Sequence, residues 1–174
     1  MIKKFELDLS TKIAMFGIEL FRIKALISFG DVEEGELGGY VEREENLSQS
    51  GDAWVYGDAR VSGNARVYGN AWVYGNAWVY GDARVSGNAR VYGNAEVSGD
   101  ARVSKSNDYI VFKNNWSSGR YFTYTYSNQK WRVGCFYGTG EELVKKAYQD
   151  SEDSGKHYEA YVNLVKTLEA LDEN

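Results

Sequence analysis

The chain has no proline and only one cysteine and one histidine among its 174 residues. The single cysteine, Cys135, excludes an internal disulfide and is typical of a protein in a reducing cytosol. Lys3 and Lys4 are not followed by an apolar segment, and no window has the length of a membrane span. We therefore expect no secretory signal, no membrane-spanning helix and a cytoplasmic location.

The chain also lacks an excess of basic residues. Its formal net charge is −5, from 20 Lys and Arg against 25 Asp and Glu, whereas proteins that bind nucleic acid directly usually carry a basic surface. We therefore do not expect direct nucleic-acid binding. The acidic run at Glu33, Glu34, Glu36, Glu42, Glu44 and Glu45 is most simply a solvated surface, and its alternative is docking against a basic partner.

What the sequence has in abundance is one short repeat. Residues 51–104 are nine consecutive six-residue units of the form Gly-(Asn/Asp)-Ala-x-Val-y. In an extended strand the Ala and Val of a unit point to one side, and x and y point to the other. Gly followed by Asn or Asp favours a sharp turn. Each unit therefore predicts a short strand and a corner, and such units must stack to bury their apolar side.

Identical corners and short strands favour a coil with three strands, or eighteen residues, in each turn. Side chains eighteen residues apart are then predicted to lie in columns on three outer faces. We name these the first face (Trp54, Trp72, Arg90, Tyr56, Tyr74 and Tyr92), the second face (Arg60, Trp78, Glu96, Ser62, Tyr80 and Ser98) and the third face (Arg66, Arg84, Arg102, Tyr68, Ser86 and Ser104).

Two of these faces suggest contacts. Aromatic side chains in register form an apolar patch of the kind that marks interaction surfaces. The alternative is that Tyr and Trp are present because they favour β-strands and stack on one another. The residues that we predict at a subunit interface are Trp54, Trp72, Tyr56, Tyr74, Tyr92 and Trp78. The residues that we predict to bind a partner or a small anionic ligand are Arg66, Arg84, Arg102 and Tyr68, because guanidinium groups and aromatic rings suit phosphates and bases.

Residues 1–50 are predicted to form a β-rich cap on the coil. Segments 12–16 and 18–27 flank Gly17 and are expected to pair as a hairpin. Val41 and Leu47 have the repeat spacing, but Leu47 and Val55 are two residues too far apart. We therefore expect irregular early turns of the coil with a small insertion near residues 49 and 50.

Residues 105–174 are predicted to form a small α+β unit that leans on the end of the coil. The expected strands are 109–113, 121–126 and 131–137, with a hairpin between the last two. Thr139 and Glu142 form a capping box that begins a helix reaching about Gln149. A break at 151–155 is expected before a second helix from Lys156 to about Leu171.

The repeat closely resembles that of the hexapeptide-repeat family, whose fold is a left-handed parallel β-helix. The stretch LGGYVEREENLS running into GDAWVYGDARV, together with VGCFYGTGEEL, is similar to small hexapeptide-repeat proteins of bacteriophages and prophages. The resemblance implies a left-handed coil, a homo-oligomer, most simply a trimer, and a bacterial host cell as the setting. It also suggests a host protein as partner, as for an inhibitor of a bacterial defence system such as an anti-CRISPR protein.

The composition of the coil argues against the catalytic members of that family. The acyltransferases use a histidine on the coil as a general base, and the carbonic anhydrases need three histidine ligands for their metal, whereas His157 is the only histidine in the chain. Ice-binding coils carry arrays of Thr, and this coil has none. No GxxxxGK(S/T) phosphate loop is present.

Cys135 and His157 are the remaining catalytic candidates, as a nucleophile and base, against the simpler interpretation of a structural thiol and a helix-end histidine. We therefore expect a non-enzymatic binding protein with no cofactor and no metal. The alternatives are an acyltransferase with a divergent site and a protein that sequesters a small anionic or nucleotide ligand.

Overall fold

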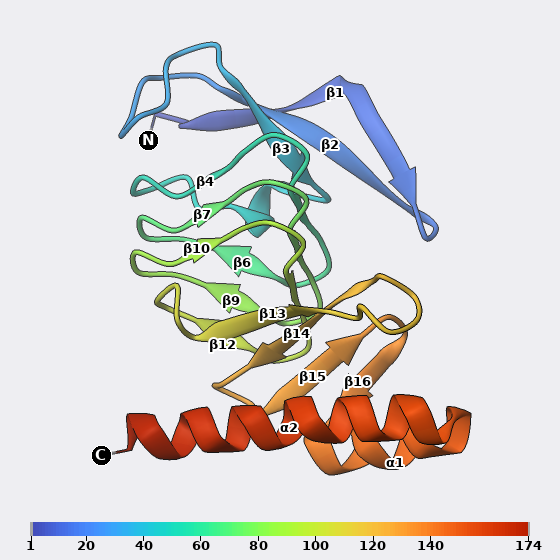
Figure 1. Ribbon diagram of the computed structural model, residues 1–174. Coiled ribbons are helices and arrows are strands. Elements are labelled where there is room, and N and C mark those ends of the chain that lie inside the picture. The colour runs from blue at the N-terminus through green and yellow to red at the C-terminus, as the bar shows by residue number, and fades with distance from the viewer. Residues whose placement is uncertain (1, 174) are drawn as a thin grey trace.

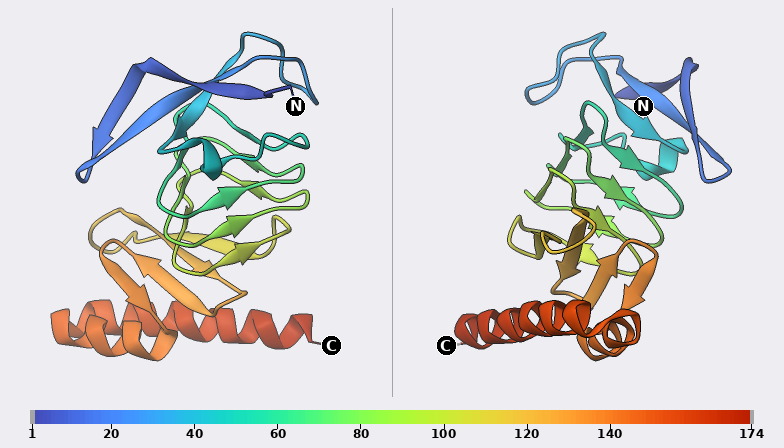
Figure 2. Two further views of the ribbon diagram at one scale, coloured as in Figure 1. Left: turned by 180° about the vertical axis from the view of Figure 1, so that it is seen from behind. Right: turned by 45° about the vertical axis from the view of Figure 1, so that its right-hand side comes forward.

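The protein is a mainly β structure, with a parallel β-solenoid between two flanking units (Figure 1). The computed structural model describes residues 2–173. An antiparallel hairpin covers one end of the solenoid, and an antiparallel sheet with two helices covers the other, as the views in Figure 2 also show. None of the helices within the described residues is long and apolar enough to cross a membrane.

The solenoid is built from nine two-residue strands, one in each repeat. They are β4 (Trp54–Val55), β5 (Arg60–Val61), β6 (Arg66–Val67), β7 (Trp72–Val73), β8 (Trp78–Val79), β9 (Arg84–Val85), β10 (Arg90–Val91), β11 (Glu96–Val97) and β12 (Arg102–Val103). They form three parallel stacks, β4-β7-β10, β5-β8-β11 and β6-β9-β12. Three strands therefore complete one turn, as the spacing predicted.

The eighteen-residue columns are confirmed by the strand register. Trp54 pairs with Trp72, and Trp72 pairs with Arg90. Arg66 pairs with Arg84, which pairs in turn with Arg102. Backbone hydrogen bonds run from turn to turn, for example from the Trp72 amide to the Ala89 carbonyl at 2.9 Å.

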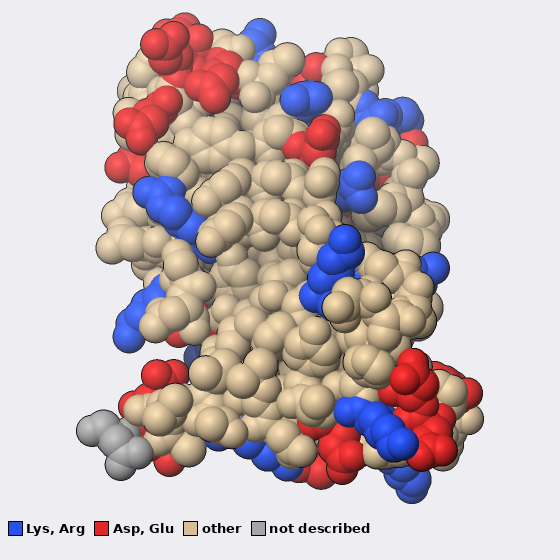
Figure 3. Space-filling model, viewed as in Figure 1, with Lys and Arg blue, Asp and Glu red and all other residues tan. Residues whose placement is uncertain are grey.

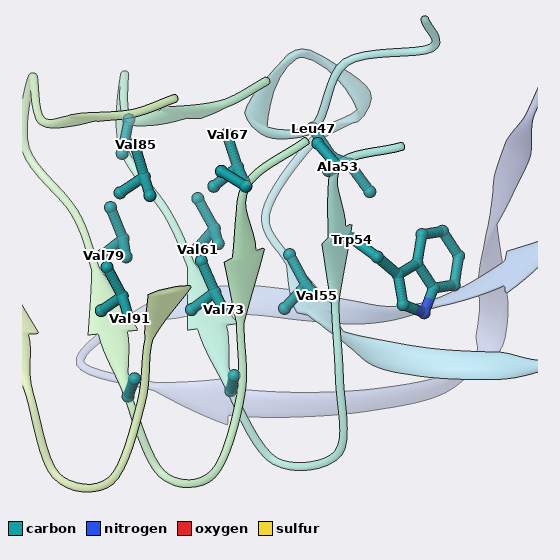
Figure 4. Close-up of a cluster of buried hydrophobic side chains, with 14 of the residues drawn as sticks. Leu47, Ala53, Trp54, Val55, Val61, Val67, Val73, Val79, Val85 and Val91 are labelled. Atoms are coloured by element: carbon teal, nitrogen blue, oxygen red, sulfur yellow. The ribbon is translucent and has the colours of Figure 1, made fainter. Parts of the chain in front are cut away.

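The interior of the solenoid contains the Ala and Val of every repeat. All of these side chains have zero exposed surface, and Figure 4 shows the valines gathered in the interior between the strands. The corner glycines have φ between 58° at Gly57 and 72° at Gly51, a region that residues with a Cβ avoid. The repeat therefore encodes both the apolar interior and the corners.

The amino-terminal unit is a hairpin of β1 (Phe5–Met15) and β2 (Ile18–Ala25). Its turn residues, Phe16 and Gly17, have φ values of 49° and 82°, as a two-residue hairpin turn requires. The predicted hairpin is confirmed, and its first strand extends back to Phe5.

One irregular turn of the solenoid precedes the first repeat. Strand β3 (Leu37–Val41) pairs with β2 on one side and with β5 on the other. A short 3-10 helix, η1 (Glu44–Asn46), follows. Val41 aligns with Val61 and Leu47 with Val67, each pair twenty residues apart. The predicted two-residue insertion is thereby confirmed.

The carboxy-terminal unit contains β13 (Tyr109–Lys113), β14 (Tyr121–Thr125), β15 (Lys130–Val133), β16 (Phe136–Gly138), α1 (Gly140–Asp150) and α2 (Glu152–Asp172).

Two predictions about the carboxy-terminal unit are corrected by the structure. Segment 131–137 is two strands, because the chain turns at Gly134 with φ of 55°. The break between the helices is Ser151 alone, whose hydroxyl accepts from the Ser154 amide and so caps α2 directly. The capping box at Thr139 is confirmed.

This unit closes the end of the solenoid, as expected. The amides at the last turn donate to its hydroxyls: Glu96 to Thr123 at 3.0 Å and Arg102 to Ser127 at 2.8 Å. The Tyr109 hydroxyl donates to the Arg90 carbonyl at 2.9 Å. These contacts satisfy backbone groups that an uncapped solenoid would leave without partners.

Candidate binding faces of the solenoid

The second face is occupied by the protein's own flanking units. Phe16, at the tip of the β1–β2 hairpin, stacks on Trp78 with ring centroids 5.8 Å apart. At the other end, Arg132 of β15 lies 5.1 Å from the centre of the Tyr80 ring and 3.7 Å from the Glu96 carboxylate. Burial, with the nearby Glu96 carboxylate, raises the pKa of Tyr80 to about 12. This face therefore fixes the flanking units to the solenoid.

The top of the first face is covered as well. Trp54 has no exposed surface and packs edge-on against Phe5 and Phe29, with centroids 6.2 and 5.3 Å away. In Figure 4 its ring lies outside the solenoid, beside the amino-terminal strands. The expectation that Trp54 contacts another subunit is corrected, because the cap of the same chain already encloses it.

The rest of the first face is aromatic and open. Trp72 packs against the Tyr56 ring at 5.2 Å and beneath the Arg90 guanidinium at 3.8 Å. Tyr74 and Tyr92, one turn apart, stack with centroids 5.1 Å apart and planes within 9°. Tyr92 is 49% exposed. The one charged side chain of this face thus lies against an indole, and no described flanking element covers the tyrosine pair.

The open aromatic surface continues onto the carboxy-terminal sheet. A groove of about 520 Å³ adjoins Tyr92 and is bordered by Tyr109, Ile110, Phe112 and Tyr121. Figure 3 shows few charged side chains in the middle of the side on which β13 crosses the foot of the solenoid. The first face and β13 together form an extended surface rich in aromatic and aliphatic side chains.

The third face is cationic. Arg66, Arg84 and Arg102 are exposed in one column, and none of them forms an ion pair with another residue in the described part of the chain. Arg66 and Arg84 line two adjoining hollows of about 500 and 360 Å³. Tyr68 lines the larger hollow, and Glu45 lines both.

The structure thus brings together three of the four residues predicted to bind a ligand. Arg102 lines neither hollow and lies at the last turn, where its amide meets Ser127. We call the two hollows together the Tyr68 trough. The sequence did not predict that η1, with Glu45, forms a wall of these hollows. The irregular turn before the first repeat has no period from which its side chains could be placed.

Cys135 and His157 show no sign of acting together. Cys135 is exposed in the turn between β15 and β16. His157, on α2, stacks on Trp116 at 4.5 Å, and its Nδ1 lies 2.8 Å from the Asp153 carbonyl oxygen. No hydrogen bond joins the two residues within positions 2–173. The same part of the chain has no group of three His, Cys, Asp or Glu residues that could hold a metal.

Comparison with known families gives a match confined to the solenoid. A model of the YdcK β-solenoid repeat matches residues 59–75, 65–81 and 83–97. No curated protein sequence matches the chain. The fold and this match define a β-solenoid repeat protein, similar over these residues to the YdcK type, with flanking units to which the match does not extend.

Proposed function

We propose that the protein is a non-enzymatic binding protein that assembles with copies of itself through the first face. One observation carries this proposal. Below Trp54, which the cap encloses, the first face is not covered by the protein's own flanking units, and its one charged side chain, Arg90, lies against the Trp72 ring. Its surface is rich in Tyr and Trp, with an Arg stacked on an indole, and these residues are enriched where proteins associate.

The other two faces are poorer candidates for self-association. The hairpin tip and β15 already occupy the second face. Copies that met through the third face would bring unpaired arginines together, and like charges at a contact oppose association. The resemblance to hexapeptide-repeat proteins favours a trimer and a left-handed coil, and we carry both forward as part of the proposal.

The test is the molar mass in solution, measured by light scattering at micromolar concentration. We expect the wild type to be an oligomer and Tyr92→Glu to be a monomer, because a carboxylate would be buried without a partner in the interface. Tyr68→Glu is the matched control, since Tyr68 holds the same repeat position and is 40% exposed on the third face. It should leave the mass unchanged. A monomeric wild type would contradict the proposal, as would dissociation by Tyr68→Glu alone.

We also propose that the partner of this assembly is a bacterial host protein, in the cytoplasm of the infected cell. The support is the resemblance of the entry and repeat sequences to small phage-encoded proteins. A defence complex of the CRISPR type is the partner to test first. Expression of the chain in a bacterium with active CRISPR immunity should restore plating of a targeted phage, and unchanged plating would reject this partner.

The proposal that the protein is not an enzyme has its own test. A hexapeptide-type acyltransferase would bind acyl-CoA between subunits, so titration of the oligomer with acetyl-CoA in a calorimeter separates the two possibilities. We expect no measurable binding. Saturable heat at one site per chain would instead favour the acyltransferase alternative.

A further inference from the structure

The ring of Tyr68 differs from the other outward-facing tyrosines of the solenoid. Tyr56, Tyr74, Tyr80 and Tyr92 each pack against another aromatic ring. Tyr68 has no such neighbour among the described residues, because the register places Ser86 on the next turn and Ser48 on the preceding one. Both positions beside its ring are therefore occupied by small side chains, and the larger hollow of the Tyr68 trough opens on the Ser48 side.

The first face of the solenoid shows that the position beside an outward-facing tyrosine can hold a second aromatic ring. On the first face, where the next turn carries a second tyrosine, Tyr74 and Tyr92 stack at 5.1 Å. This is close to the spacing of about 4.8 Å between adjacent strands and within the range in which aromatic pairs form. A planar ring bound beside Ser48 would lie against Tyr68 as Tyr92 lies against Tyr74.

The trough also supplies cationic groups beside that position. Arg66 begins β6, which Tyr68 directly follows, and Arg84 pairs with Arg66 one turn further along the solenoid. Neither guanidinium forms an ion pair among residues 2–173, although the carboxylates of Glu45 and Asp82 also line the smaller hollow. Arg90 on the first face, in contrast, lies against Trp72. Free guanidinium groups bind phosphate oxygens through paired hydrogen bonds. The trough volumes also lie in the usual range for small-molecule sites.

We infer that the Tyr68 trough is a binding site for a mononucleotide. The base stacks on Tyr68 in the space beside Ser48, and the phosphate lies between Arg66 and Arg84. Glu45 lines both hollows and forms no ion pair within the described chain. Its carboxylate is placed to accept a hydrogen bond from an exocyclic amino group, which favours adenine, guanine or cytosine over uracil. The inference goes beyond the proposed self-association, which uses a different face.

The experiment is calorimetric titration of the full-length protein with AMP, adenosine and inorganic phosphate. We expect AMP to bind at least tenfold more tightly than either adenosine or phosphate, because both ends of the trough contribute. Tyr68→Ala should weaken AMP binding by roughly fivefold to a hundredfold, the usual effect of removing a base-stacking ring. Arg84→Ala should weaken it as well.

Two matched controls keep the result interpretable. Tyr92→Ala removes an exposed tyrosine from the first face, and Arg102→Ala removes the arginine of the same column that lies outside the trough. Both should bind AMP as the wild type does, whatever their oligomeric state. Absence of AMP binding at millimolar concentration would overturn the inference. So would equal affinity for phosphate and AMP, or wild-type affinity in Tyr68→Ala.

Discussion

At the scale of single residues, the stability of the solenoid depends on the contacts that each residue makes with the next turn. Gly75 and Gly93 occupy successive turns of the same corner, with φ of 69° and 67°. A Cβ added to Gly75 would lie 3.0 Å from the Gly93 backbone nitrogen, whereas one added to Gly93 would have nothing within 4 Å. A side chain at either position would be strained by the positive φ, but only one at Gly75 would also press against the backbone of the next turn.

We expect Gly75→Ala to destabilise the protein more than Gly93→Ala. Both substitutions place an alanine in the left-handed region, at a cost of roughly 1–2 kcal/mol. Gly75→Ala must also push two backbone turns apart, and such overpacking adds about 1–3 kcal/mol. The measurement is the free energy of unfolding from urea denaturation of both variants. Equal unfolding midpoints would show that the turns separate without cost.

At the scale of elements, the β1–β2 hairpin is attached to the solenoid through its tip. Phe16 is 84% exposed, yet its ring lies nearly parallel to that of Trp78, with planes within 5°. Met15 approaches the solenoid as well, with its sulfur 3.3 Å from an Arg60 nitrogen. The hairpin is therefore both an extension of the β3-β5-β8-β11 sheet and a brace along the second face.

We expect Phe16→Ala to release the hairpin tip without disturbing the solenoid. An aromatic pair contributes about 0.5–1.5 kcal/mol, which corresponds to roughly twofold to tenfold faster amide exchange at residues 12–19. Exchange at β8 and β11 should stay as in the wild type. Leu9→Ala is the control, because Leu9 is exposed on the same strand. Equal exchange in the two variants would mean that the ring contact does not hold the tip.

At the scale of the whole molecule, the stability should pass through a maximum at alkaline pH. Lys4 is buried, donates to the Gly51 and Ala53 carbonyls, and has its pKa lowered to about 8 by burial, against an opposing effect of Asp52. Burial raises the pKa of Tyr56 and of Tyr109 to about 12.

The two shifts act in opposite directions. Between about pH 8 and 10 the unfolded chain holds a proton on Lys4 that the folded chain has released, so the free energy of unfolding rises with pH. Above about pH 10 the unfolded tyrosines lose protons that the folded ones retain, so it falls again.

We expect the urea midpoint to increase from pH 7 to about pH 9.5 and to decrease beyond pH 10.5. Lys4→Met removes the titrating group and should abolish the increase while leaving the decrease in place. The comparison concerns the slope with pH, since the variant also loses two hydrogen bonds and is less stable at every pH. An undiminished rise in Lys4→Met would show that another group causes it.

The amino-acid sequence by itself determined the solenoid. Its repeat places Ala and Val inward, sets glycine at each corner and brings side chains eighteen residues apart into columns, because these properties follow from local periodicity. The two-residue insertion before Val55 could be predicted because it interrupts that period, and the capping box at Thr139 because Thr139 and Glu142 form a local sequence motif.

Only the tertiary structure decided which faces are free. The cap encloses Trp54, the hairpin tip covers Trp78, and η1 adds a wall beside Arg66 and Arg84 but not beside Arg102. Each of these depends on contacts between segments outside the repeat, where no period relates one residue to another. The turn at Gly134 and the single-residue break at Ser151 likewise depend on how the carboxy-terminal sheet and helices pack.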